Sequence, residues 1–545
     1  MFGECCRKLL RFPVVWRSGG VESGYPQGGF QVQRKIRRQL ETRKRRTRER
    51  IEKTNWNGQS PMIDPPTIHY ELAERTQAIA AGGLGVVQQL VRQLGVAGSI
   101  NRGCPIFKFH LPYSEADHVL NIAYNLLAGG TCLEHLELRR NDEAYLEALG
   151  AQRIPDPTTA GDFCRRFSAW GVFALMESFH EPRLEVWRQQ PREFFERAVI
   201  EADGTMVETC GERKEGIGMN HKGEWGYHPL VMTLANTREV LYLVNRPGNR
   251  PSHEKAAVYF DRSIDLCRRG GFRKVRLRGD TDFSQTTHLD RWHEDGVEFV
   301  FGMDAMPNLV EIAENLPESA WKRLDRKQGR VNKSGKTRAR RPNFKEQFVV
   351  KQGYQNKRLE QEFVAEFDYR PTACRHTYRM VVLRKQVRVS QGQQKLFDDS
   401  PYFFYITNVT KTEAPPRAVV GESNQRCDQE NIISQLHAMG ALSAPVHDLV
   451  SNWAYMVMAT LAWNLKSWLG LSITESCPPA AREKRQADKR RIVRMDFATF
   501  RQTLIEIPAQ ILRCGRQLIY RLLTWTPSLE SLFRLHSCVG LPLRH

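Results

Sequence analysis

The chain has 545 residues, enough for roughly two to four domains, and 81 Lys and Arg against 61 Asp and Glu give it a formal net charge of +20. Such an excess favours a polyanionic partner, because neutralising a phosphate backbone releases its condensed counterions. The 12 cysteines include no Cys-x-x-Cys pair, which excludes a zinc ribbon and a disulfide framework and fits a reducing compartment.

The first 60 residues are expected to form a basic, flexible arm. Residues 34–53 hold eleven Lys or Arg against three Glu. Such a run is typical of a solvated tail, and equally of a helix that lies on DNA phosphates. Residues 61–190 are expected to form a helical domain, because apolar side chains recur at helical spacing over 86–94 and 119–127. This domain is either a DNA-binding unit or a helical scaffold.

From residue 191 the apolar pattern changes to the period of strands. The expected elements are strands over 198–207, 227–234 and 240–244, a helix over 254–267, a strand that ends at Asp280, a helix near 289–292 and a strand over 297–301. Three successive strands followed by alternating helix and strand predict a mixed α/β fold. The order matches a ribonuclease-H-like sheet, with its core split between residues 191–302 and 401–475.

Residues 303–400 separate the two parts of the core. A compact domain does not carry a loop of this length without structure of its own, and strand patterns recur over 363–369, 378–383 and 386–389. We therefore expect an inserted, mostly β subdomain. Its front, residues 321–345, is strongly basic, and the DNA-binding candidates there are Trp321, Lys322, Arg323, Arg340 and Arg341.

The C-terminal segments are expected to be helical. The most apolar stretch, 453–471, is interrupted by Asn464 and Lys466, which favours a buried helix over a membrane span. Residues 476–545 are expected to be a helical basic tail, with seven Lys or Arg over 482–494. The N-terminus lacks a signal-like apolar core. We expect a cytoplasmic, nucleoid-associated protein without a membrane partner.

Three carboxylates stand out as candidate catalytic residues. Asp203 and Asp280 each follow a predicted strand, and ligands cluster outside the carboxyl ends of strands in open α/β sheets. Glu430 lies on a predicted helix whose same face presents Arg426 and His437. Each carboxylate alone is better explained as an ordinary strand-end or helix-surface residue. Together they predict a site for phosphodiester chemistry.

The three carboxylates suit two divalent metal ions, which need shared carboxylate ligands. Mg²⁺ fits because it takes few protein carboxylates and keeps water and phosphate oxygens, and Mn²⁺ is expected to substitute. Arg426 and His437 are expected to contact the phosphate. Asp282 is the alternative second carboxylate, and Asp280 is preferred because it lies nearer the end of its strand.

Short motifs in a fixed order resemble the DDE transposases of bacterial insertion sequences, in the family numbered thirteen-eighty. They lie within about residues 75–525 and include Gly82-Gly83-Leu84, Leu127-Ala128-Gly129-Gly130, Pro157-Thr158-Thr159, Glu201-Ala202-Asp203-Gly204-Thr205, Gly226-Tyr227-His228-Pro229-Leu230, Arg246-Pro247-Gly248-Asn249, Arg278-Gly279-Asp280, Gln429-Glu430-Asn431, Ala462-Trp463-Asn464-Leu465 and Ile507-Pro508-Ala509. The resemblance implies a ribonuclease-H-like core interrupted by a β insertion, and cut-and-paste movement through terminal inverted repeats. It implies Asp203, Asp280 and Glu430 as the metal ligands.

The sequence departs from the pattern of related enzymes at three positions. His437 stands where relatives place Lys, Ser423 where they place Tyr, and Asp282 where they place Gly. Some related enzymes stack a flipped base on an aromatic residue of the insertion, for which Trp321 is the candidate, although a core tryptophan is the preferred interpretation. The expected partner is double-stranded DNA, at the inverted repeats and the target, with a homodimer holding two ends. The alternatives are an inactive DNA-binding relic and a DDE-type nuclease without strand transfer.

Overall fold

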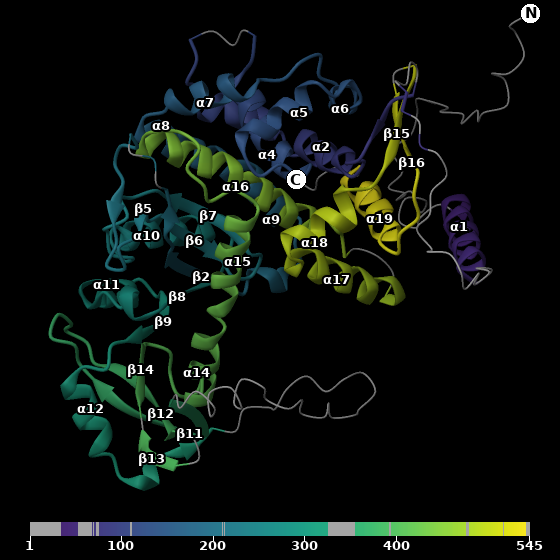
Figure 1. Cartoon of the computed structure of the whole chain (residues 1–545). Helices are drawn as coiled ribbons and strands as arrows, with labels where there is room; N and C mark the ends of the chain where they lie inside the picture. Colours follow the sequence, from purple (N-terminus) through teal and green to yellow (C-terminus); the bar gives the residue numbers. More distant parts are fainter. Residues whose placement is uncertain are drawn as a thin grey trace, which may run out of the picture.

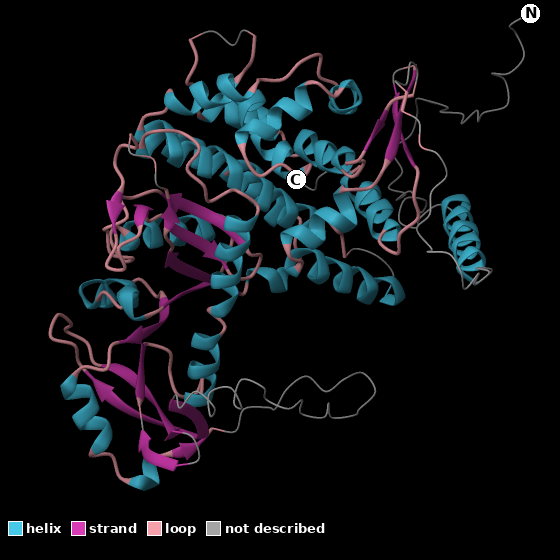
Figure 2. Cartoon of the chain, in the orientation of Figure 1, coloured by secondary structure: helices cyan, strands magenta, loops and turns pink. Residues whose placement is uncertain are grey.

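A computed structural model describes residues 34–52, 68, 70–71, 76–108, 112–209, 211, 213–324, 355–391, 394–399, 401–475, 479–515 and 517–540. The fold is mixed α/β, with one large mixed sheet and many helices (Figures 1 and 2). In Figure 1 the helices over residues 84–178 lie at one end of the molecule, and strands β11 (Gln355–Tyr369) to β14 (Tyr402–Thr407) lie at the other.

The large sheet runs in the order β10-β11-β12-β14-β9-β8-β2-β6-β7, with β13 paired to β12. Its strands are β2 (Arg197–Gly204), β6 (Leu230–Leu234), β7 (Glu239–Val244), β8 (Lys274–Gly279), β9 (Glu298–Met303), β10 (Lys322–Arg323), β11 (Gln355–Tyr369), β12 (Tyr378–Gln391), β13 (Gln394–Asp399) and β14 (Tyr402–Thr407). Strand β8 lies between β2 and β9 and is parallel to both. The carboxyl ends of β2 and β8 therefore meet at one edge, where Asp203 and Asp280 stand.

The expected core elements are present, but two of the expected strands are divided. The strand expected over 198–207 ends as β2 at Gly204, and Val207 belongs to β3 (Val207–Glu208), in a different sheet. The predicted helices over 254–267 and 289–292 are α10 (Ala256–Arg269) and α11 (Leu289–Glu294). The single strand expected over 227–234 is wrong, because the chain forms β5 (Trp225–Tyr227) in a small sheet with β3 and β4 (Gly218–Met219), and then β6 in the large sheet. Pro229 separates them, since it has no backbone N–H to donate to a continuous ladder.

Strands β10–β13 of the expected insertion join the core sheet. Strand β12 pairs with β14, for example Met380 with Ile406, and β14 pairs with β9. The inserted strands therefore extend the sheet that carries Asp203 and Asp280, and α12 (Pro307–Glu314) leads into them.

The C-terminal segment is not wholly helical, and that expectation is wrong. Helices α17 (Pro479–Arg494) and α18 (Phe497–Phe500) are followed by a hairpin of β15 (Ala509–Cys514) and β16 (Gln517–Leu522), then by α19 (Leu529–Val539). Strand β15 pairs with β1 (Ala78–Ile79), more than 400 residues earlier in the chain. A partner so distant in sequence leaves no local pattern, which is why the basic composition alone pointed to helix.

Helix α16 (Leu449–Leu471) is the central helix of the molecule. All its residues from Ser451 to Leu471 are buried, as expected for the 453–471 stretch. It packs on β7 and on α4 of the N-terminal helices. Those helices are α2 (Leu84–Gln93), α3 (Val96–Gly103), α4 (Glu115–Leu127), α5 (Leu136–Arg140), α6 (Glu143–Leu149), α7 (Pro157–Arg165), α8 (Ala169–Ser178) and α9 (His180–Arg188). Within the described ranges, no helix is long and apolar enough to cross a bilayer.

A buried polar cluster joins α9, β7 and α16. The fully buried Glu239 carboxylate accepts from Arg183 Nε at 2.9 Å, from Trp187 Nε1 at 2.9 Å and from Trp468 Nε1 at 2.7 Å. Buried charges of this kind are stable only while paired and hydrogen-bonded.

We predict that Glu239→Ala lowers the free energy of unfolding by about 3–5 kcal/mol, because it leaves the buried Arg183 guanidinium without its counter-charge. Denaturant unfolding measures the loss. Arg140→Ala, which removes an exposed pair with Glu137, is the matched control and should change stability by less than about 0.5 kcal/mol. Equal effects of the two substitutions would contradict the prediction.

Candidate active site

Three carboxylates from three elements meet at one guanidinium. Arg426 Nη1 lies 3.5 Å from Asp203 Oδ2 and 3.3 Å from Asp280 Oδ2. Its Nη2 lies 2.9 Å from Glu430 Oε1. The structure thus gathers the three predicted carboxylates and the predicted arginine in one cluster, although they are spread over more than 220 residues of sequence.

Local backbone structure sets the position of each carboxylate. Asp203 Oδ1 accepts from the Gly204 backbone N–H at 2.8 Å at the end of β2. Asp280 is the N-cap of the short helix η3 (Thr281–Phe283), and its Oδ1 accepts from the Asp282 backbone N–H at 3.1 Å. Glu430 lies in the first turn of α15 (Cys427–Ala438), where the helix dipole favours an acidic side chain.

Burial raises the pKa of both aspartates of the cluster. Burial raises the pKa of Asp203 to about 7, and the neighbouring Asp280 carboxylate adds to the rise while Arg426 opposes it. Burial also raises the pKa of Asp280, against the opposing effect of Arg426. The site therefore has a deficit of positive charge, because one guanidinium faces three carboxylates.

Asp282 and His437 lie beside the cluster in different ways. Asp282 is exposed, and its link to Asp280 is made through its backbone N–H. His437 Nε2 lies 3.0 Å from Thr205 Oγ1, two residues beyond Asp203. Burial lowers the pKa of His437, which favours the neutral ring. A neutral ring donates one hydrogen bond but brings no charge toward a phosphate.

The structure describes three of the five predicted DNA-binding residues of the insertion. Trp321 is 8% exposed and packs in the core, with Arg384 Cζ 4.2 Å above its ring, which agrees with the core interpretation. Lys322 and Arg323 are exposed on β10. Arg340 and Arg341 lie outside the described residues.

A buried ion pair beneath the cluster was missed by the sequence analysis. Arg278 Nε donates to Glu201 Oε1 at 2.8 Å across the parallel pair β2 and β8, and both side chains are buried. Arg278 Nη1 also donates to the Glu422 carbonyl at 2.9 Å, at the end of α14 (Pro416–Asn424). The pair therefore ties the sheet to the helix that leads directly into Arg426.

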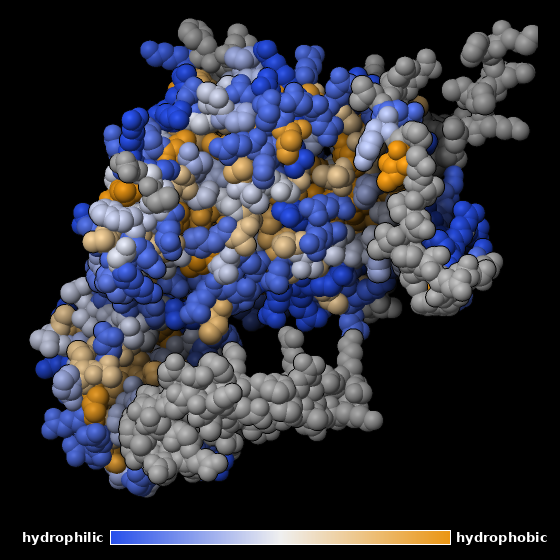
Figure 3. All heavy atoms as spheres, in the orientation of Figure 1, coloured by the Kyte–Doolittle hydropathy of each residue, from blue (hydrophilic) through white to orange (hydrophobic). Residues whose placement is uncertain are grey.

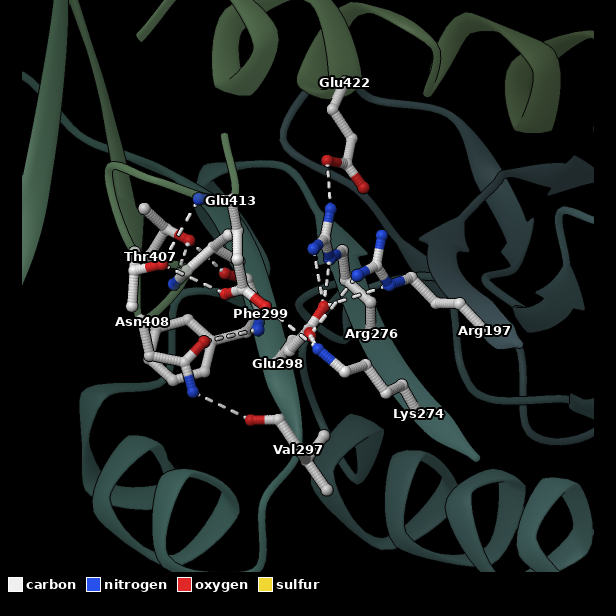
Figure 4. A network of polar contacts seen from close by, with 12 residues as sticks. Arg197, Lys274, Arg276, Val297, Glu298, Phe299, Thr407, Asn408, Glu413 and Glu422 are labelled. Atoms are coloured by element: carbon white, nitrogen blue, oxygen red, sulfur yellow. Dashed lines mark hydrogen bonds and ion pairs between the residues drawn. The ribbon is translucent and has the colours of Figure 1, made fainter. Parts of the chain in front are cut away.

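A second polar network is centred on Arg276, two residues before Arg278 on β8. Arg276 Nη2 lies 2.5 Å from Glu298 Oε2, and its Nη1 lies 2.5 Å from Glu422 Oε2 (Figure 4). Glu298 also pairs with Arg197 and Lys274. The sequence held a signal for these contacts, because Arg276 and Arg278 alternate with apolar residues and so share the face of β8 that α14 covers.

Two further contacts fasten α15 to the sheet. Gln429 donates to the Val231 carbonyl at 2.8 Å and accepts from Thr233 Oγ1 at 3.0 Å, next to Glu430. Arg238 pairs with Asp428, and its Nη1 donates to the Arg494 carbonyl at 2.8 Å. Arg238 has φ of 60°, which side chains other than glycine rarely adopt, so the surrounding structure holds it there.

A cleft of about 380 Å³ opens beside Asp280 and Arg426. Its walls include Tyr402 and Phe403 of β14 and Asp304 at the end of β9. Of the three carboxylates, Asp280 lines this cleft.

The donor set fits a divalent cation in its chemistry. Across the described ranges, no three His, Cys, Asp or Glu side chains form a ready-made metal cluster. The three carboxylates converge instead on the Arg426 guanidinium. Carboxylate oxygens are the ligands that Mg²⁺ prefers, and the surplus negative charge around Arg426 is what a cation would offset. Asp203, Asp280 and Glu430 are therefore the residues that could hold it.

Comparison with known proteins gives a family match over most of the chain. A family model described as transposase DDE domain group 1 matches residues 76–539. No curated protein matches the chain. Among solved structures, the chain is similar to a piggyBac transposase in a synaptic complex with hairpin DNA, with 9% identity, a TM-score of 0.32 and coverage of 78% of this chain and 81% of that one.

The raised pKa of Asp203 predicts how stability changes with pH in the absence of divalent metal. Between its usual value and about 7, the folded chain binds the proton more tightly than the unfolded chain, so stability falls as pH rises through this range. We predict that Asp203→Asn removes this contribution and is more stable than wild type at pH 8, by about 2–4 kcal/mol.

Thermal or denaturant unfolding in EDTA, from pH 4 to pH 8, checks this prediction. Asp282→Asn is the matched control, since Asp282 is exposed, and it should follow the wild-type profile. An Asp203→Asn profile parallel to that of wild type across the whole range would sink it.

Proposed function

The chain belongs to the transposase DDE domain family, and from that premise we propose that it is a DNA transposase of an insertion sequence. In this proposal it binds terminal inverted repeats, hydrolyses phosphodiester bonds at the ends of the element and transfers the resulting 3′-hydroxyl ends to target DNA. The core around β2, β6–β9 and β14 would then be ribonuclease-H-like. The observation that carries the proposal is the convergence of Asp203, Asp280 and Glu430 on Arg426.

Asp203, Asp280 and Glu430 would hold Mg²⁺, with Mn²⁺ as a substitute. When bound, the metal activates a water or 3′-hydroxyl nucleophile and stabilises the departing oxygen. Arg426 lies within reach of all three carboxylates and is placed to attract the phosphate of the scissile bond. In this proposal the DNA backbone approaches Asp280 and Arg426 through the cleft that they line.

We propose that the half-buried His437, like Arg426, contacts the phosphate of the scissile bond. Its hydrogen bond with Thr205 steadies the turn that follows Asp203. An enzyme that joins two element ends must hold both at once, so a homodimer is the expected active form.

We predict that Asp203→Asn, Asp280→Asn and Glu430→Gln each lower cleavage of a labelled terminal repeat by more than about 100-fold. Loss of an outer partner of a metal ligand typically costs 10–100-fold, and loss of the ligand itself costs more. Cleavage should require Mg²⁺ or Mn²⁺ and stop in EDTA. Gel analysis of the cleaved ends, with target plasmid present to capture joined products, measures both steps.

Asp282→Asn is the matched control, because Asp282 lies two residues from Asp280 but outside the contacts of Arg426. It should retain most of the cleavage. Full activity of Asp280→Asn would remove Asp280 from the site. Wild-type binding without any cleavage would favour an inactive DNA-binding relic, and cleaved ends that never join the target would favour a nuclease without strand transfer.

A further inference from the structure

Helix α1 (Arg34–Glu52) is the most highly charged element of the described chain. Its 19 residues include ten Lys or Arg and three Glu, and none of them is buried. Most helical stability in proteins comes from a buried apolar face, which α1 lacks. Its like charges also repel one another along the helix. An external polyanion would relieve that repulsion.

The helix is nevertheless anchored to the body of the protein. Arg43 Nη1 donates to the carbonyls of Leu522 and Thr524, at 3.0 and 3.2 Å, where β16 ends. Leu40 packs against the main core. These contacts fix one face of α1 and leave the neighbouring face, toward α17 and α19, open. Figure 1 shows α1 beside this C-terminal part of the fold.

A groove of about 900 Å³ lies between α1 and the pair α17 and α19. The α1 wall carries Arg34, Arg37, Lys44 and Arg48, with Glu41 as its one carboxylate. Strongly hydrophilic side chains gather over α1 and α17 on the face seen in Figure 3. The α1 wall of the groove is therefore basic, while Leu40, Trp525 and Pro527 are among its apolar lining residues.

The two walls differ in how their charges are paired. On the far wall, Lys484 lies 2.7 Å from Glu530, and Arg534 pairs with Glu530 and Asp488. On the α1 wall, no carboxylate of the described residues forms an ion pair with any of the four cations. The uncompensated positive charge of the groove is thus concentrated on α1.

The length of this charged face indicates an extended polyanion as its partner. Arg34 and Arg48 are fourteen residues apart, or about 21 Å along the helix axis. Duplex DNA carries one negative charge per about 1.7 Å of its axis, so a line of cations this long meets several phosphates at once. A small anion would occupy only a fraction of it.

We propose that the groove between α1 and the α17–α19 pair binds the phosphate backbone of duplex DNA, at a site separate from the catalytic carboxylates. The inference rests on the proposed function in taking DNA as the ligand. None of the three carboxylates around Arg426 lies on α1, α17 or α19. The groove connects to them through Arg238, which holds both the Arg494 carbonyl at the end of α17 and Asp428 on α15.

The test measures binding of the full-length protein to a labelled duplex of random sequence in EDTA, over a range of salt concentrations. Arg37→Ala/Arg48→Ala removes two charges from the groove, and Arg45→Ala/Arg50→Ala removes two from parts of α1 that do not line it. The groove variant should bind at least about tenfold more weakly, and its slope of log affinity against log salt should be shallower by about 2. The control should keep the wild-type slope.

Arg37→Lys/Arg48→Lys keeps the charge and should restore the slope, which separates lost contacts from a misfolded helix. Equal slopes for the groove and control variants would overturn the proposal. It would also be overturned if the groove variant lost binding to anionic vesicles but bound the DNA duplex as the wild type does. The proposed function fails separately: a wild type that never cleaves but shows the groove-specific slope keeps this site and loses the catalytic assignment. If the wild type cleaves but the groove variant binds DNA as the wild type does, the catalytic assignment stands and the groove proposal fails.

Discussion

The mutual repulsion of three carboxylates is the constraint on which the rest of this structure depends. Asp203, Asp280 and Glu430 come from two strands and a helix, and one guanidinium, that of Arg426, stands among them. Burial and like charge raise the pKa of Asp203 to about 7, so the fold bears an electrostatic cost at this point. A site under such strain needs a scaffold that holds its elements in place.

That scaffold is built from charges as well as apolar packing. The pairs Arg278–Glu201 and Arg276–Glu422 lie between the sheet and α14, immediately before Arg426. Replacing buried pairs with apolar residues often leaves stability unchanged, so their value here lies in fixing register. Arg276 and Arg278 both bond Glu422, so they hold the end of α14, four residues before Arg426, against β8.

Local sequence patterns predict the positions gathered around Arg426 but not the contacts that gather them. Asp203 and Asp280 follow apolar strands, and Glu430 shares a helical face with Arg426, so strand-end and helix-periodicity rules single them out. Glu422 and Arg238 carry no such pattern, because their partners lie far away in the sequence. The same reason hides the pairing of β15 with β1: an edge contact across the whole chain is decided by the assembled fold.

The two ends of the described chain are therefore connected to α15, the helix that carries Glu430. Strand β1 pairs with β15, and α1 is held at the end of β16. Helix α17 ends at Arg494, whose carbonyl accepts from the same Arg238 that pairs with Asp428, two residues before Glu430. Because Arg238 is buried and held at positive φ, it has little freedom to satisfy one partner without the other. Gln435 of α15 adds a second connection, because it donates to Asp496 Oδ1 and accepts from the Phe497 backbone N–H just beyond α17.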